Sequence, residues 1–586
     1  MSDYTNATLI LAENELKKFL SKFPDYSFEP DFQINPELTS GSLELTDNVL
    51  VFQAPDAVEI LYTVYAFAEK FLGWCFFEPG RDRFNHKMAK EISQGTVFEM
   101  PEKLLKRRGF IQEFDFSEDS YMTADWMARN GLNYVLVWMK FYDKASPELK
   151  EYFAVRGIEI ESGHHNFNYW IPPQEYCKSN PDFFAIIDGK RISPTMDKSA
   201  LLLSEQLCTT NKDLRDEIVN NMIKYCKANP EVKTISLIPN DGFGWCECEE
   251  CSKFYSPETK GELYSLSTHV YKADRIYHDM FNYVAGKLRA ALPNVSLTMC
   301  AYVNYVSPSE GFKLHDKSAV HFAPYWRCVN HKIDEKCPIN ERYADDVKKW
   351  VSAKSGGEVN IYEYLMGVNL YVSLPFVFHE EIFDEIKWFS QNGVDGYLTQ
   401  FHIPHWTVYG MNFYCMAKAA MGEDKQVVLN NLLQSLFGDD FEKGRAFYSK
   451  MHDLVHSAGE CHITYPRALF NRTKLEQYQE IHNLALEISE NAGQDQFLKE
   501  LSLWTEYLLR FKGLFDKYQE EGLCIQEIDE FLAWIHSYPE SRVFVHDKID
   551  MLLNAWKTAI ENNTEWIHFN IGWEDDYIRL HDRTMK

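Results

Sequence analysis

Residues 107–115 read RRGFIQEFD and residues 133–139 read NYVLVWM, two short apolar runs that are separated by a segment with helical periodicity. Six more runs of this kind follow, and they begin at Ile158, Thr234, Val295, Ala319, Glu358 and Asp395. Short apolar runs that alternate with helices are typical of repeated βα units with a parallel sheet. Eight such units in about 310 residues predict an α/β chain whose centre is a closed (β/α)8 TIM barrel with loop insertions.

The regions before and after the barrel pattern predict two further domains. Residues 1–100 read as a small α/β accessory domain, with a strand at 48–55 and an amphipathic helix at 56–71. The barrel is expected at residues 101–422. Beyond Gly422 the strand patterns end, and long amphipathic segments, one of them running from Ile525 to Ile560, predict an α-helical C-terminal domain at residues 423–586. The chain is therefore expected to contain three domains.

Composition and charge limit the classes of partner. The chain has 87 acidic and 60 basic residues, which gives a formal net charge of -27. Nucleic acid and anionic membranes both require a basic face, so neither is expected as a partner. Aromatic residues make up 15% of the chain. Aromatic rings stack on the apolar faces of sugars, but aromatic cores give the same count, so the surplus is only a weak pointer to a carbohydrate partner.

Targeting patterns and cysteine usage bear on the compartment. The first 20 residues show no basic stretch followed by an apolar run, and no window reaches about 18 uninterrupted apolar residues. Thirteen cysteines, an odd number, fit a reducing compartment better than a disulfide framework. We therefore expect a cytoplasmic protein. The sequence leaves the oligomeric state open, a homo-oligomer included.

Polar and aromatic side chains close the eight apolar runs. In a (β/α)8 barrel the chemistry lies at the C-terminal ends of the strands, so these side chains are the candidates for a functional site. They are Glu113, Trp138, Lys140, His164, His165, Asn240, Asp241, Tyr302, Tyr325, Arg327, Tyr362, Glu363, Gln400, His402 and Trp406. A set that is acidic and aromatic favours the cleavage of a carbohydrate.

Two of these residues are the candidate catalytic carboxylates. Cleavage of a glycosidic bond needs one carboxylic acid that protonates the leaving oxygen and a second carboxylate that acts as the nucleophile or as the base for water. We predict Asp241 as the general acid and Glu363 as the nucleophile or base, because their strands end across the barrel mouth from each other. The alternative is structural: Asp241 would cap a turn, and Glu363 would pair with Arg327 or Lys140.

The other residues at the strand ends are predicted to bind the substrate. A uronic acid would need a cation for its carboxylate, and Arg108, Lys140 and Arg327 are the basic residues at or near strand ends that could supply it. Either His164 or His165 is expected to face the site, because neighbours on a strand point to opposite sides. The sequence has no Gly-rich phosphate loop and no Ser nucleophile elbow, so kinase and esterase activities are disfavoured.

The sharpest local motif is a cysteine cluster directly after Asp241. Cys246, Cys248 and Cys251 lie within six residues, and Cys208, in the loop after the third apolar run, is a candidate fourth thiol. Three thiolates can wrap one zinc ion, and a fourth completes a closed tetrahedral site. We predict a structural zinc ion that holds the loop beside Asp241, with a cluster of free thiols as the alternative. No catalytic cofactor is expected, because four thiolates leave no open position for water.

Several segments resemble one bacterial family, called domain of unknown function 4838, over about residues 55 to 420. The segments are DAVEILYTVYAFAEKFLGWCFFEPGRDRF (56–84), RRGFIQEFD (107–115), NPDFFAIIDGKRI (180–192), LCTTNKDLRDEI (207–218), SLIPNDGFGWCECEEC (236–251) and IYEYLM (361–366). That family looks like a relative of the family 67 α-glucuronidases and, more distantly, of the family 20 hexosaminidases. All of these place a small α/β domain before a (β/α)8 barrel.

The resemblance implies a carbohydrate hydrolase. Asn240 and Asp241 match the family's strand-four motif, the three clustered cysteines match its cysteines, and Glu363 matches its strand-seven acid. Family 20 enzymes carry an adjacent Asp-Glu pair on strand four, whereas Gly242 follows Asp241 here, which argues against their mechanism. We therefore predict a glycoside hydrolase of an oligo- or polysaccharide, α-glucuronidase-like, with a catalytically inactive carbohydrate-binding or scaffold protein as the alternative.

Overall fold

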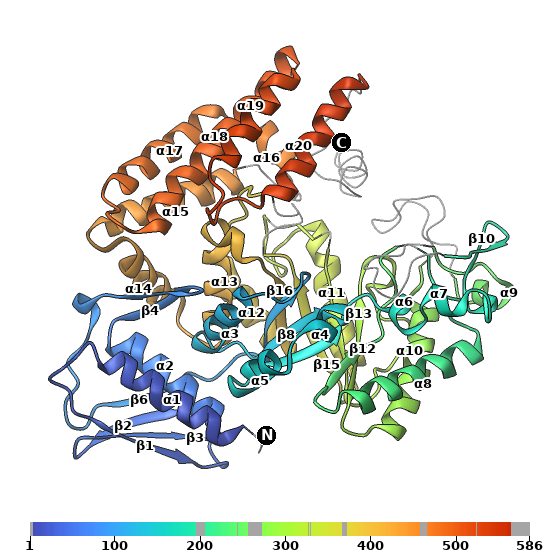
Figure 1. Ribbon diagram of the computed structural model, residues 1–586, viewed down its shortest axis with the longest axis horizontal. Coiled ribbons are helices and arrows are strands. Elements are labelled where there is room, and N and C mark those ends of the chain that lie inside the picture. The colour runs from blue at the N-terminus through green and yellow to red at the C-terminus, as the bar shows by residue number, and fades with distance from the viewer. Residues whose placement is uncertain are drawn as a thin grey trace.

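Eight parallel strands close into a barrel at the centre of the molecule (Figure 1). The computed structural model describes residues 4–194, 205–242, 244–255, 272–325, 327–328, 330–365, 372–457, 466–522 and 524–563. The barrel strands are β7 (Arg107–Gln112), β8 (Tyr134–Trp138), β9 (Glu159–Gly163), β12 (Thr234–Ser236), β13 (Ser296–Ala301), β14 (Ser318–Phe322), β15 (Glu358–Glu363) and β16 (Gly396–Gln400). Each coincides with one of the eight apolar runs, so the predicted (β/α)8 barrel is confirmed.

The barrel strands pair in chain order, and β16 pairs with β7 to close the ring. Every residue of β8, β14 and β16 is buried. Strands of a parallel barrel are covered by side chains on the inside and by helices on the outside, which explains why these runs are apolar without alternation.

Helices and short elements connect the barrel strands. The helices are α3 (Asp119–Arg129), α4 (Met139–Lys144), α5 (Pro147–Val155), α6 (Phe167–Trp170), α7 (Pro173–Tyr176), α8 (Lys212–Ala228), α9 (Glu249–Ser252), α10 (Asp274–Ala291), α11 (Pro338–Ala353), α12 (Glu381–Gln391) and α13 (Trp406–Ala420), and a small hairpin is formed by β10 (Ile186–Ile187) and β11 (Lys190–Arg191). Side-chain caps fix where two of them begin: Ser146 accepts from the Leu149 amide before α5, and Asn211 accepts from the Leu214 amide before α8.

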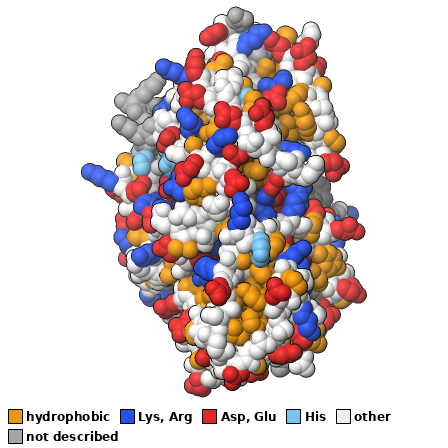
Figure 2. All heavy atoms as spheres, turned by 90° about the vertical axis from the view of Figure 1, so that its left-hand side faces the viewer, with side chains coloured by type: hydrophobic (Ala, Val, Ile, Leu, Met, Phe, Trp, Pro, Cys, Tyr) orange, Lys and Arg blue, Asp and Glu red, His pale blue; other side chains and the backbone are white. Residues whose placement is uncertain are grey.

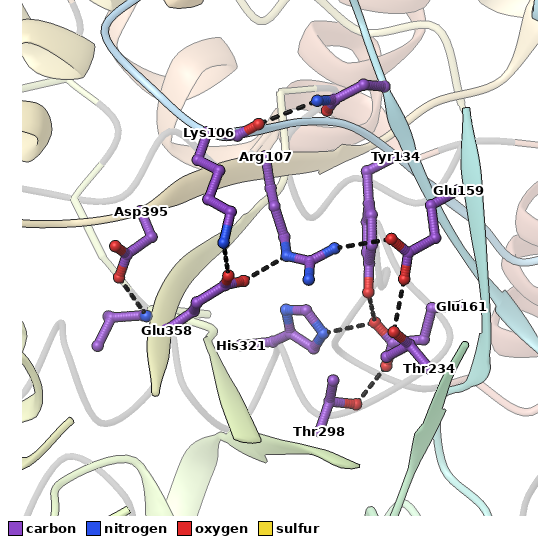
Figure 3. A network of polar contacts seen from close by, with 12 residues as sticks. Lys106, Arg107, Tyr134, Glu159, Glu161, Thr234, Thr298, His321, Glu358 and Asp395 are labelled. Atoms are coloured by element: carbon purple, nitrogen blue, oxygen red, sulfur yellow. Dashed lines mark hydrogen bonds and ion pairs between the residues drawn. The ribbon is translucent and has the colours of Figure 1, made fainter. Parts of the chain in front are cut away.

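A polar network extends from the N-terminal ends of the barrel strands to the barrel interior (Figure 3). Glu161 on β9 is fully buried and accepts hydrogen bonds from Tyr134 (2.6 Å), from His321 (2.8 Å) and from Thr298. Burial would raise the pKa of Glu161, but the charge and hydrogen bond of His321 and the two hydroxyl donors outweigh it and hold the pKa below its usual value. The network therefore ties four strands together through one enclosed carboxylate.

The N-terminal unit is a four-stranded sheet with two helices packed on it. Its strands run in the order β1 (Glu29–Ile34), β3 (Val49–Ala54), β2 (Ser42–Thr46), β6 (Val97–Glu99). The helices α1 (Thr5–Leu20) and α2 (Ala57–Phe71) lie side by side along the sheet in Figure 1. A hairpin of β4 (Trp74–Glu78) and β5 (Arg81–Phe84) follows α2, and the backbone of Phe77 in β4 accepts hydrogen bonds from two tryptophans of the barrel helices, Trp126 and Trp406.

The C-terminal unit is helical. Its helices are α14 (Lys425–Phe437), α15 (Phe441–His456), α16 (Pro466–Arg472), α17 (Leu475–Glu490), α18 (Gln496–Glu521), α19 (Ile525–His536) and α20 (His546–Glu561). The expectation of one amphipathic segment from Ile525 to Ile560 was wrong, since residues 537–545 separate two helices there. Pro539 lies in this break, and proline cannot continue a helix because it lacks an amide hydrogen and its ring clashes with the preceding turn.

The C-terminal helices hold the chain that follows strand β15. Trp504 Nε1 donates to the Ser373 carbonyl (3.0 Å), and the Tyr507 hydroxyl donates to the Val372 carbonyl (2.6 Å). The Ser373 hydroxyl donates in turn to the Val543 carbonyl. Because Glu363 ends β15, the helical unit fixes part of the connection at the C-terminal end of the barrel.

The surface carries both signs of charge. Figure 2 shows acidic and basic side chains interspersed over the face that it draws. Among the described residues, no helix combines the length and the apolar character that crossing a bilayer would need.

Candidate active site

The C-terminal ends of the barrel strands bring a cluster of acidic, histidine and aromatic side chains together. In a parallel barrel all strands end at the same rim, so side chains distant in sequence become neighbours there. The predicted residues that contact one another in this cluster are Glu113, Trp138, His164, His165, Asp241, Tyr302, Tyr325, Tyr362 and Gln400. We call this cluster the mouth.

Glu113, directly after β7, is the carboxylate at one side of the mouth. Its Oε1 atom lies 3.1 Å from His164 Nε2 and accepts a hydrogen bond from the Tyr362 hydroxyl (3.1 Å). His164 Nε2 is also 2.9 Å from the Tyr362 hydroxyl, and Gln400 Nε2 donates to the same hydroxyl (3.2 Å). Burial alone would raise the pKa of Glu113, but the hydrogen bonds and charge of His164 and the hydroxyl of Tyr362 hold it below its usual value. Glu113 is therefore ionised near neutral pH.

Asp241 lies on the other side of the two histidines. His165 Nδ1 donates to the Pro239 carbonyl (2.5 Å), and His165 Nε2 faces Asp241 Oδ1 at 4.0 Å. Burial holds the pKa of His165 below its usual value against the attraction of Asp241, so the ring is neutral at pH 7. With the hydrogen on Nδ1, the Nε2 atom that faces Asp241 is an acceptor.

Aromatic rings line the mouth between these groups. The Trp138 ring stacks on His164 with centroids 4.2 Å apart. Tyr302 lies edge-on to Tyr325 at 5.7 Å, and Tyr325 lies edge-on to Tyr364 at 5.2 Å. Rings in varied orientations around two carboxylates give a site with apolar faces and polar edges, which suits a sugar.

Three polar atoms of the mouth are buried without a hydrogen-bond partner among the described residues. They are Trp138 Nε1, His164 Nδ1 and Asp241 Oδ1. Buried polar atoms are almost always paired, because an unpaired one costs about 1–3 kcal/mol. Three such atoms in one cluster indicate a place for the hydroxyl groups of a ligand.

The backbone is strained at two points beside the mouth. His164 has φ 69° and Val303, next to Tyr302, has φ 37°. Positive φ values are uncommon for residues other than glycine, and for a β-branched residue they are outliers. Strain of this kind persists where the surrounding structure enforces it and is concentrated at functional sites.

Glu363 is placed differently from Glu113 and Asp241. It ends β15, but its side chain is only 4% exposed and its Oε2 atom accepts from Arg327 Nη1 at 2.8 Å. Arg327 also makes a bidentate pair with Glu385 on α12 (2.7 and 2.6 Å). Burial and the charge of Glu385 raise the pKa of Glu363 against the attraction of Arg327. The pairing with Arg327 that we gave as the structural alternative is the arrangement observed.

Two predicted substrate-binding residues lie elsewhere. Arg108 is the second residue of β7, at the opposite end of the barrel, and its guanidinium donates to the carbonyls of Gly131 (2.8 Å) and Leu105 (2.8 Å). Trp406 begins α13, is fully buried and packs against Trp126 at 4.8 Å. The expectation that these two line the mouth was wrong, because Arg108 lies at the N-terminal end of its strand and Trp406 faces the N-terminal unit.

Three further predicted residues have supporting or peripheral places. The Asn240 side chain is buried, accepts from the Asn168 amide (3.1 Å) and donates to the Glu205 carbonyl (2.9 Å), so it holds the loop of Asp241. Lys140 lies half-buried on α4, two residues after Trp138. His402 packs edge-on against Phe114 at 4.8 Å, and burial lowers its pKa to about 4.

Glu385 was missed at the level of sequence. It is fully buried on α12, on the same face as Ile382, Ile386 and Phe389. A glutamate on the apolar stripe of an amphipathic helix needs a buried cationic partner, and this pattern was the available signal.

The four predicted cysteine ligands also come together. Cys208, Cys246, Cys248 and Cys251 place their sulfur atoms within 4.8 Å of one another. Cys246 follows Asp241 by five residues, so this thiol cluster and the mouth are neighbours along the chain.

Comparison with solved structures finds the same fold in glycoside hydrolases. A family 138 enzyme that targets pectin rhamnogalacturonan II matches with a TM-score of 0.54 and 8% identity, over 90% of this chain and 71% of that one. A family 115 4-O-methyl-α-glucuronidase with specificity for decorated arabinogalactans also matches with a TM-score of 0.54, at 11% identity, over 94% of this chain and 78% of that one. Identities this low establish a shared fold and nothing finer.

The sequence comparisons point to one family. No curated protein sequence matches the chain. The model of the family described as domain of unknown function (DUF4838) matches residues 75–440, which is more than half of the chain and spans the whole barrel. The chain belongs to the DUF4838 family.

Proposed function

We propose that the protein is a glycoside hydrolase whose active site is the mouth. The observation that carries the proposal is the set of three buried polar atoms without partners, on Trp138, His164 and Asp241, beside two carboxylates that are each about one quarter exposed. A ligand that fills this place must offer several hydroxyl groups and an apolar face. A sugar ring has both.

Asp241 is proposed as the general acid, as the sequence predicted. A general acid must carry a proton before the bond breaks and must stand where it can deliver it to the leaving oxygen. The neutral His165 places its acceptor nitrogen 4.0 Å from Asp241 Oδ1, so it brings no positive charge next to the proposed acid.

The second carboxylate is proposed to be Glu113 in place of Glu363. A nucleophile or base must be ionised and must reach the substrate. Glu113 meets both conditions, because its pKa is held low and its side chain is 24% exposed. Glu363 has a raised pKa, its side chain is 4% exposed, and one of its oxygen atoms accepts from Arg327. We therefore propose that Glu363, together with Glu385, holds Arg327 in place.

A uronide substrate is the specificity we propose to test first. A solved glycosidase of the same fold is named as an α-glucuronidase. Of the three cations considered for the sugar carboxylate, Arg108 lies at the far end of the barrel and Arg327 is bound by two carboxylates. Lys140 follows Trp138 by two residues at the C-terminal end of β8, and we propose to replace it first.

The test is a screen of the purified protein against aryl glycosides and natural oligosaccharides, uronides included. Glu113→Gln and Asp241→Asn are expected to lower kcat by about 10²- to 10⁴-fold, the usual contribution of a positioned acid or base. Asp115→Asn is the matched control, because Asp115 lies two residues from Glu113 but is exposed and paired with Lys144, and it should keep wild-type turnover.

The same panel separates the alternatives. If Glu363→Gln loses turnover with an unchanged melting temperature while Glu113→Gln stays active, Glu363 is the second carboxylate as the sequence predicted. If the wild type binds glycans but releases no sugar across the panel, the protein is a carbohydrate-binding member of a glycosidase fold and the proposed activity is wrong.

A further inference from the structure

The geometry of the cysteine cluster points to a bound metal ion. In a tetrahedral site with zinc–sulfur bonds of about 2.3 Å, the sulfur atoms lie about 3.8 Å apart. The Cys208 sulfur lies 3.7 Å from that of Cys248 and 3.9 Å from that of Cys251. These separations are far longer than the ~2.05 Å of a disulfide, and none of the four cysteines forms a disulfide.

Hydrogen-bond donors surround the sulfurs. The Ile186 amide donates to Cys246 Sγ (3.3 Å), and the Cys251 amide donates to Cys248 Sγ (3.5 Å). The Thr210 hydroxyl lies 3.1 Å from Cys251 Sγ. Donors aimed at sulfur stabilise thiolates, and such outer contacts orient the ligands of metal sites. Four thiolates at these distances would repel one another without a cation between them.

We propose that Cys208, Cys246, Cys248 and Cys251 bind one zinc ion that fixes the loop carrying Asp241. With four protein ligands the ion has no open position, so its role is structural. The site joins segments that are otherwise held by few regular elements: Ile186 of β10, the segment before α8, and α9, all at the right of the barrel in Figure 1.

A short path connects the metal site to the mouth. Gln206, two residues before Cys208, donates to the carbonyls of Asn240 (2.6 Å) and Gly242 (3.1 Å). Its Oε1 atom accepts from the Asn240 amide (3.0 Å). Gln206 therefore binds the backbone of both neighbours of Asp241, Asn240 and Gly242. A metal ion bound by Cys208 would hold the segment of Gln206 in place.

The experiment is metal analysis of the full chain, purified without a histidine tag under reducing conditions. Wild-type protein should contain one zinc ion in this site, and Cys251→Ser should lose it. Cys226→Ser is the matched control, because Cys226 is as buried as Cys208 (6% exposed each) but lies outside the cluster, and it should retain the zinc.

Among the described residues, two other groups of three ligand-type residues could add metal to the total. They are Cys328, His331 and Cys337, and Glu381, His452 and His456. The difference between wild type and Cys251→Ser therefore decides the assignment. Equal zinc content in the two proteins, or iron in place of zinc in the wild type, would overturn it.

A second measurement uses only wild-type protein, so it tests the site even if Cys251→Ser fails to fold. Cobalt(II) exchanged into wild-type protein should give the intense visible bands of a tetrahedral site together with sulfur-to-cobalt charge-transfer bands. A spectrum of octahedral cobalt without charge transfer would contradict the tetrathiolate. Neither measurement uses a sugar substrate, so the zinc proposal can fail while the glycosidase proposal stands, and the reverse.

Discussion

Among the described residues, two glutamate–histidine pairs lie in the barrel, one in its interior and one at its mouth, and they differ in what surrounds them. Glu161 and His321, 2.8 Å apart in the interior, are fully buried, and the carboxylate accepts two further hydrogen bonds from hydroxyl groups. Glu113 and His164, 3.1 Å apart at the mouth, lie beside buried polar atoms that have no partner among the described residues. The Nδ1 atom of His321 also lacks a partner among the described residues, so the two pairs differ in their carboxylates. Glu161 is fully enclosed, whereas the Glu113 side chain is 24% exposed.

This difference separates stability from function. An enclosed carboxylate whose donors are all in place contributes to folding and cannot reach a ligand, whereas a partly exposed carboxylate can contact a substrate. Changes at Glu161 should therefore affect mainly stability, and changes at Glu113 should affect mainly activity.

The largest expected effect comes from breaking the enclosed pair. Glu161→Ala leaves the buried His321 without its carboxylate partner and the Tyr134 hydroxyl without its acceptor. We therefore expect a loss of about 3–5 kcal/mol in the free energy of unfolding. Glu113→Ala should cost about 1 kcal/mol, because its partners lie at a partly open rim. Urea unfolding of both variants measures these losses. Equal losses would show that the Glu161–His321 and Glu113–His164 pairs contribute equally to stability, which would contradict the comparison.

The pH dependence of stability should follow the enclosed pair. The folded pKa of Glu161 is below the unfolded value of about 4.3, so its contribution is fully present above that pH and is lost as the pH falls through the folded pKa. The gap in melting temperature between wild type and Glu161→Gln should therefore be constant from pH 7 to about 5 and narrow below about 4. A gap that widened in acid would contradict the assigned direction.

The smallest effects should separate two tryptophans. Trp138→Phe keeps a ring on His164 but removes the unpaired Nε1 atom, so the Kd of a bound sugar should rise about two- to tenfold with little change in melting temperature. Trp406→Phe removes the hydrogen bond to the Phe77 carbonyl and should lower stability by about 1 kcal/mol with Kd unchanged. Calorimetric titration measures Kd, and thermal scans measure stability. A raised Kd in Trp406→Phe would show that Trp406 contributes to sugar binding after all.

The sequence by itself determined the architecture. Eight apolar runs separated by helical patterns have one compact solution, a parallel barrel, because each run must be covered on both sides. The common direction of parallel strands then places the residues that close the runs at one rim. This is why the sequence alone predicts that Glu113, His164, Asp241 and Tyr362 lie together.

Only the tertiary structure decided the chemical state of those residues. Whether a glutamate at a strand end faces solvent or a buried arginine depends on partners far away in sequence, and for Glu363 the decisive charge, Glu385, comes from a neighbouring helix. Contacts between distant segments also decide where the Arg108 side chain points, how Trp406 packs and that Cys208 lies next to the other three thiols. Burial and hydrogen bonding set charge and reactivity, and both are properties of the folded chain.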